Sequence, residues 1–100
     1  MFLDLMKVSE RELINMSDTA SVIRVGSTER PIKDRLFEYE KLGYKGKMFY
    51  AATNHMKDCE DRCLLNARLH GGAKYNFYEQ SIASNREGFV YIIQGNWMED

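Results

Sequence analysis

The stretch from residue 20 to residue 42 constrains the fold more than any other part of the chain. It starts with the β-branched run 20–25, which is typical of a short strand and stops at Gly26. Ser27 or Thr28 can cap the helix that follows. That helix is indicated by apolar residues at helical spacing and by a glycine stop: Ile32, Leu36, Tyr39 and Gly43. The sequence therefore predicts a strand, a Gly-Ser-Thr turn and a helix in direct succession.

Further elements are expected on both sides of this unit. In chain order they are a helix over 9–16, a strand over 46–53, a helix from Asn54 or Asp58 to about Leu69, and a strand over 88–94. In the first helix, Ser9 is the expected N-cap and Glu12 its capping-box partner. The last strand is nearly all apolar, which predicts a central place in a sheet. Residues 73–87 indicate mostly loop.

These elements predict an α/β (α+β) fold, with a small three-stranded, mainly antiparallel sheet flanked by two or three helices. A chain of 100 residues is the size of one domain. Its net charge of −1 creates no global field for nucleic acid or anionic membrane, so any phosphate site must be local. The apolar start of the chain is short and carries Asp4, which argues against a signal peptide or a membrane span.

The cysteine pattern favours an intracellular protein, in the cytoplasm or nucleus. Cys59 and Cys63 lie four residues apart in an expected helix, where the backbone holds them in poor geometry for a disulfide. A reducing compartment fits this arrangement. With His70 the two thiols would make only three zinc ligands at a spacing that matches no strong finger pattern, so we expect buried structural cysteines.

Glu60 occupies an unexpected place in the helical pattern. On a helical wheel it lies inside the apolar arc formed by Met56, Cys59, Cys63, Leu64 and Ala67. A carboxylate that faces a core is costly unless it is paired, and Arg35, beside the apolar face of its own helix, is a candidate partner. A structural ion pair between the two helices, or a Glu60 side chain that bends out to solvent, would explain the same pattern.

The motifs Val22-Ile-Arg-Val-Gly-Ser-Thr28 and Arg35-Leu-Phe-Glu-Tyr39 resemble the GIY-YIG nuclease superfamily. The resemblance extends over residues 21–65 and is to the divergent branch with a "KIG-T" strand and an "R-L-x-x-Y" helix. It implies a single GIY-YIG-like domain over residues 1–100.

The resemblance also implies roles for individual residues. Gly26 would let the chain turn beside a substrate phosphate, Arg35 would contact that phosphate, and Glu60 would bind one divalent metal ion. Arg24 stands where the family has a tyrosine. The family's "GIY" strand is matched by the segment 88–91 at the far end of the chain. This predicts a circularly permuted sheet, in which the C-terminal strand lies beside the strand 20–25 and brings Tyr91 near Arg35.

A Mg²⁺-dependent phosphodiesterase, a DNA-binding hydrolase, follows as the first functional hypothesis. Arg35 would neutralise the phosphate, and Mg²⁺ at Glu60 would polarise a phosphoryl oxygen. Tyr91, Tyr50 or His55 would have to activate the attacking water. We therefore predict Arg35, Glu60 and Tyr91 as catalytic residues.

Two non-catalytic alternatives remain open. Lys74, Tyr75 and Arg86 interleave basic and aromatic groups, as in proteins that hold single-stranded nucleic acid, although such residues also serve to cover a thin core. The other alternative is a protein-interaction domain, in which apolar residues near the two termini form a contact between two copies of the chain: Phe2, Leu3, Trp97 and Met98.

Overall fold

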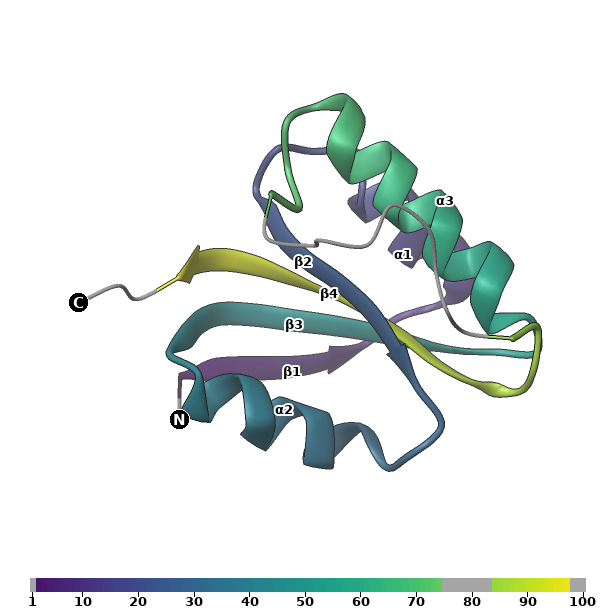
Figure 1. The fold of residues 1–100 in the computed structure, drawn as a ribbon, viewed down its shortest axis with the longest axis horizontal. Helices are drawn as coiled ribbons and strands as arrows, with labels where there is room; N and C mark the ends of the chain where they lie inside the picture. The colour runs from purple at the N-terminus through teal and green to yellow at the C-terminus, as the bar shows by residue number, and fades with distance from the viewer. Residues whose placement is uncertain (1, 75–83, 98–100) are drawn as a thin grey trace.

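The computed structural model describes residues 2–74 and 84–97 of the chain. The elements, in chain order, are β1 (Leu3–Lys7), α1 (Glu10–Met16), β2 (Val22–Thr28), α2 (Ile32–Lys41), β3 (Tyr44–Thr53), α3 (Met56–Leu69) and β4 (Gly88–Trp97) (Figure 1). Within these residues no helix has the length and apolar character needed to cross a membrane.

Among the described residues, four strands form one sheet in the order β1-β3-β4-β2. Strand β4 pairs antiparallel with both β3 and β2, whereas β1 pairs parallel with β3. The predicted α/β class is therefore confirmed, and so is the central place of the apolar strand that begins at Gly88. The predicted pairing of this strand with the one that contains Gly26 is also confirmed. The sheet has one strand more than expected, because the first residues of the chain pair with β3.

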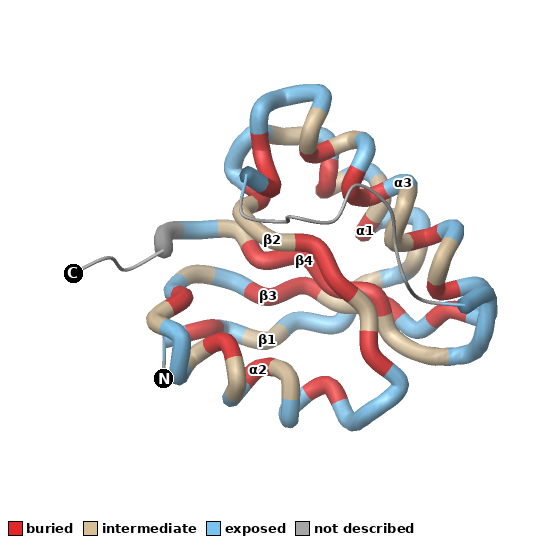
Figure 2. The backbone as a smooth tube through the Cα atoms, viewed as in Figure 1, coloured by how far each residue is buried: buried red, intermediate tan, exposed pale blue. Residues whose placement is uncertain are grey.

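The helices lie on opposite faces of the sheet (Figure 1). One core joins α1 and α3 to the sheet and contains Leu13, Val25, Cys63 and Ile92. The other core joins α2 to the opposite face and contains Leu36, Tyr39, Met48 and Tyr91. Buried positions accordingly run along the middle strands and along the sheet-facing side of each helix (Figure 2).

The predicted capping box of α1 is confirmed. The Ser9 hydroxyl accepts a hydrogen bond from the Glu12 backbone amide at 3.1 Å, and the Glu12 carboxylate accepts one from the Ser9 amide at 2.9 Å. The predicted end of α3 at about Leu69 is also confirmed.

The predicted N-cap of the second helix is wrong. Ser27 and Thr28 are the last residues of β2, because they pair with Val90 and Phe89 of β4. Helix α2 begins only at Ile32, four residues after Thr28, and its N-cap position, Pro31, makes no side-chain capping bond. The strand signal before Gly26 thus continues through the glycine instead of stopping there.

Two glycines lie directly opposite each other in the paired strands β3 and β4. Gly46 and Gly95 pair in register and have φ angles of 125° and 143°. A Cβ atom on either glycine would collide with the backbone of the opposite strand. This close approach lets β4 continue past its predicted end at Gln94 as far as Trp97.

The two cysteines are free thiols buried beneath α3, as predicted. A hydrogen bond with the Cys63 thiol, together with burial, raises the pKa of Cys59. Because both side chains are buried, iodoacetamide reaches them only when the protein opens, and we expect both cysteines to react at least about 100-fold more slowly in the native protein than in urea. Mass spectrometry of pulse-labelled protein measures this ratio, and equal labelling under the two conditions would contradict it.

Candidate functional site

A pocket of about 410 Å³ lies at the free end of strand β2. Its lining includes Ser27 and Thr28 from the strand, Arg30 from the following loop, Arg35 from α2 and Met56 from α3. Among the described residues, β2 is the last strand at one edge of the sheet. The pocket is thus built where helices from opposite faces of the sheet meet around one strand edge.

Glu60 reaches this strand end from α3. Its side chain is half-buried, and the Ser27 hydroxyl donates a hydrogen bond to its Oε1 at 2.5 Å. The prediction that Glu60 faces inward, between the buried positions of its helix, is therefore confirmed. The partner found for it is Ser27, a residue expected to cap a helix.

Arg35 reaches the same strand end from α2, on the other face of the sheet. One of its terminal nitrogens lies 3.3 Å from the carboxylate of Glu38, and a terminal nitrogen of Arg30 lies 2.8 Å from that same carboxylate. The Arg35 Nε is buried and has no hydrogen-bond partner among the described residues. The two guanidinium groups thus share one carboxylate, and the second carboxylate at the pocket, Glu29, pairs with Arg86.

Gly26 and Tyr91 form a matched pair across β2 and β4. A Cβ on Gly26 would overlap the phenol of Tyr91, so a glycine is needed here. The Tyr91 hydroxyl is hydrogen-bonded to the Tyr39 hydroxyl at 2.8 Å, and the side chain is only 2% exposed. The Tyr91 phenol therefore lies beneath the strand instead of opening to solvent.

Burial, followed by the nearby Tyr39 phenol, raises the pKa of Tyr91. The charge of Arg35 acts in the opposite direction and that of Glu60 in the same direction, so both groups act electrostatically on this phenol. A phenol with a raised pKa stays protonated at neutral pH, and Tyr91 cannot readily take a proton from water. Tyr91 is brought to the predicted place but in a form unsuited to act as a base.

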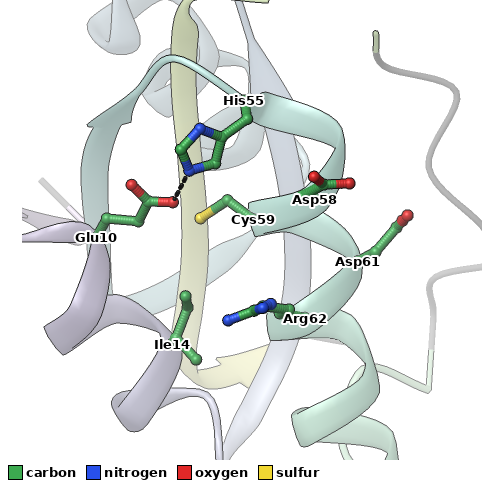
Figure 3. A pocket seen from close by; sticks show the side chains of 7 residues that line it. All are labelled: Glu10, Ile14, His55, Asp58, Cys59, Asp61 and Arg62. Atoms are coloured by element: carbon green, nitrogen blue, oxygen red, sulfur yellow. Dashed lines mark ion pairs between the residues drawn. The ribbon is translucent and has the colours of Figure 1, made fainter. Parts of the chain in front are cut away.

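The other two residues proposed to activate water lie elsewhere. Tyr50 packs edge-on against Phe89. His55 forms an ion pair with Glu10 at 2.7 Å, in a separate pocket of about 540 Å³ between α1 and α3 (Figure 3). Neither is among the described residues that line the pocket at β2. His55 instead makes a contact with the first residue of α1.

Two members of the predicted basic and aromatic patch, Lys74 and Arg86, lie in the described part of the chain. Lys74 is exposed and follows Ala73, whose amide donates to the carbonyl of Val22 at the start of β2. Arg86 pairs with Glu29 at 2.8 Å, just beyond the other end of β2. Tyr75 lies outside the described residues. The two described members of the patch are thus separated by the length of a strand.

Two further expectations concern metal and self-association. Among the described residues, no group of three or more histidine, cysteine or acidic side chains is close enough to hold a metal ion, and His70 pairs with Asp18 at 2.6 Å. Of the apolar residues expected to form a dimer contact, Phe2 is exposed but Leu3 is buried, because β1 packs beneath α2. The expected role of Leu3 is therefore wrong, and the side chains of Trp97 and Met98 lie outside the described part of the chain.

Comparison with protein families, with curated proteins and with solved structures finds no match for this chain.

The sequence did not predict three polar contacts of the site, which are made by Ser27, Glu38 and the Tyr39 hydroxyl. A strand through residues 22–28 would have placed the side chains of Val25 and Ser27 on the same face of the sheet as α3. The length of this strand is set by its pairing with β4, which is distant in sequence. The Glu38 contact follows from its place three residues after Arg35, a spacing that signals a helical ion pair.

Proposed function

We propose that the pocket at the end of β2 binds a phosphodiester of nucleic acid, and that the domain cleaves it with the help of a divalent metal ion at Glu60. The observation that supports this most is that Arg35 and Ser27 line one pocket, and that the Ser27 hydroxyl donates a hydrogen bond to Glu60. The resemblance to the GIY-YIG superfamily implies roles for the same two residues, Arg35 and Glu60.

Arg35 is the proposed phosphate contact. Its guanidinium shares Glu38 with Arg30, so a phosphate that enters the pocket would be a second anion for two cations. The Nε donor of Arg35, which lacks a partner among the described residues, supports the same role. A planar guanidinium suits the paired oxygens of a phosphodiester.

Glu60 is the proposed metal ligand. The oxygen donors there, the Glu60 carboxylate and the Ser27 hydroxyl, fit Mg²⁺, which is commonly held by one or two carboxylates and completes its shell with water and substrate phosphate. When bound, such an ion neutralises charge on the phosphoryl and leaving oxygens. The Ser27 hydroxyl fixes the orientation of the carboxylate.

Tyr91 supports this site from beneath and does not accept the proton from water in our proposal. Its buried hydroxyl, held by Tyr39, keeps β4 in register under Gly26. The attacking water must then be activated by another group. This point favours the second candidate function, a module on the same fold that binds nucleic acid or protein without cleaving it.

We expect the protein to act inside the cell, where its free thiols stay reduced.

Cleavage of labelled DNA in Mg²⁺ or Mn²⁺ tests the proposal. We expect Glu60→Gln to slow cleavage by about 100-fold or more, because a metal ion contributes several kcal/mol to transition-state stabilisation. Arg35→Gln should weaken binding even in EDTA, where Glu60→Gln should bind like the wild type. The matched control is Asp61→Asn, a neighbouring carboxylate on α3 that pairs with Lys57, and it should leave both measurements unchanged.

The outcomes separate the two candidate functions. Binding without cleavage in the wild type would select the non-catalytic module. Cleavage that survives both Glu60→Gln and Arg35→Gln at the wild-type rate would remove the proposed site.

A further inference from the structure

We propose that Arg24 binds a second phosphate, next to the one held by Arg35, so that the substrate is a polynucleotide strand and not a mononucleotide. This inference rests on the proposed function of the Arg35 pocket. It assigns a role to the arginine that stands where the resembled family has a tyrosine.

The placement of Arg24 follows from the pairing of β2. Arg24 and Gly26 pair with Ile93 and Tyr91 of β4, two residues apart in regular register, so both face the α2 side of the sheet. The Arg24 guanidinium carbon lies 5.8 Å from the centre of the Tyr39 ring. Tyr39 and Arg35 are one helical turn apart on α2. Arg24 and Arg35 therefore lie on the same side of the sheet, on either side of Tyr39.

The spacing of positions along β2 and α2 suits a nucleic-acid backbone. Two strand residues span roughly 6.6 Å, and one helical turn about 5.4 Å. Both lengths are comparable to the separation of successive phosphates in one strand. Arg30 and Arg35 both line the pocket and share the Glu38 carboxylate, so Arg24 would add a third guanidinium group on the same side of the sheet.

The surroundings of Arg24 keep its guanidinium charged and ordered. Burial alone would lower its pKa, but the phenols of Tyr39, Tyr44 and Tyr91 raise it overall. The cation–π contact with the Tyr39 ring restricts the side chain, which reduces the entropy lost when it binds a phosphate. The side chain also remains partly exposed, as a ligand contact requires. These features describe a pre-ordered cation on the side of the sheet that carries α2.

Binding of a short fluorescein-labelled oligodeoxythymidylate, measured by anisotropy in EDTA over a series of salt concentrations, tests the inference. We expect Arg24→Gln to weaken binding about tenfold, the scale of one lost charged hydrogen bond. It should also reduce the slope of log affinity against log salt by about 0.7, the value for one phosphate of a single strand. Arg24→Lys, which keeps the charge, should retain the wild-type slope even if it is less stable.

Two controls separate this inference from the proposed function. Arg11→Gln removes an exposed arginine from α1, on the opposite face of the sheet, and should leave the slope unchanged. Competition by thymidine 5′-monophosphate should be weakened by Arg35→Gln but not by Arg24→Gln, because a single phosphate fills only the Arg35 position.

A wild-type slope in Arg24→Gln, with a reduced slope in Arg35→Gln, would overturn the second phosphate site and leave the first intact. No binding by the wild type, or binding indifferent to Arg35, would overturn both.

Discussion

Gly26→Ala should lower the free energy of unfolding by about 3 kcal/mol, the scale of overpacking a rigid core together with loss of a buried hydrogen bond. The added methyl group would meet the oxygen and two ring carbons of Tyr91. That ring has little room to move, since it is 2% exposed and its hydroxyl is held by Tyr39. The variant should also lose affinity at the neighbouring pocket, because β2 would have to shift. Urea unfolding followed by circular dichroism measures the first effect.

A double-mutant cycle identifies the cause. If the collision with Tyr91 is responsible, Gly26→Ala in a Tyr91→Leu background should cost at least about 1 kcal/mol less than in the wild type. Gly71→Ala is the matched control: Gly71 has a φ of 80° and, among the described residues, nothing within 4 Å of an added Cβ. Backbone strain alone should cost it about 1 kcal/mol. Equal losses at positions 26 and 71 would contradict the collision.

Gly46→Ala should be still more damaging, with a loss of about 4 kcal/mol from backbone strain and overpacking combined. The new Cβ would collide with the carbonyl of Gln94 and the Cα of Gly95, which are backbone atoms and cannot rotate away. The φ of 125° adds strain for any residue with a side chain. A domain of this size has only about 5–15 kcal/mol of stability, so a large share of it would be lost.

Gly95→Ala should reproduce this loss, because Gly95 meets the carbonyl of Lys45 and the Cα of Gly46 from the other strand. The two losses should not add, since one displacement of the strands relieves both collisions. Thermal unfolding of the two single variants and the double variant measures this coupling. Full additivity would show that the glycines act independently and that their close approach is not the reason for them.

Much of the fold was predictable because local signals and tertiary packing agree. The Ser9–Glu12 capping box, the apolar run after Gly88 and the apolar face of α2 each gave the correct element. Strand β1 was missed since its five residues have only two apolar positions facing the core, Leu3 and Leu5. Its pairing with β3 is parallel and distant in sequence, so no turn signal announces it.

The site was predictable only in part for a related reason. Glu60 could be found because a carboxylate inside an apolar helical arc breaks a local pattern. Ser27 could not, because hydroxyl residues after a strand also signal a helix cap, and only pairing with β4 decides between the two. The protonation state of Tyr91 depends on burial and on Tyr39, which lies 52 residues away in the chain.

The two cores on either side of the sheet have a consequence for how the domain responds to a ligand. Arg35 belongs to the helix that covers one face of the sheet, and Glu60 to a helix that covers the other face. A weakened core should therefore loosen one half of the site and leave the other in place. A nucleic-acid strand that contacts both residues would link the two helices, and amide hydrogen exchange should then slow in α2 and α3 together.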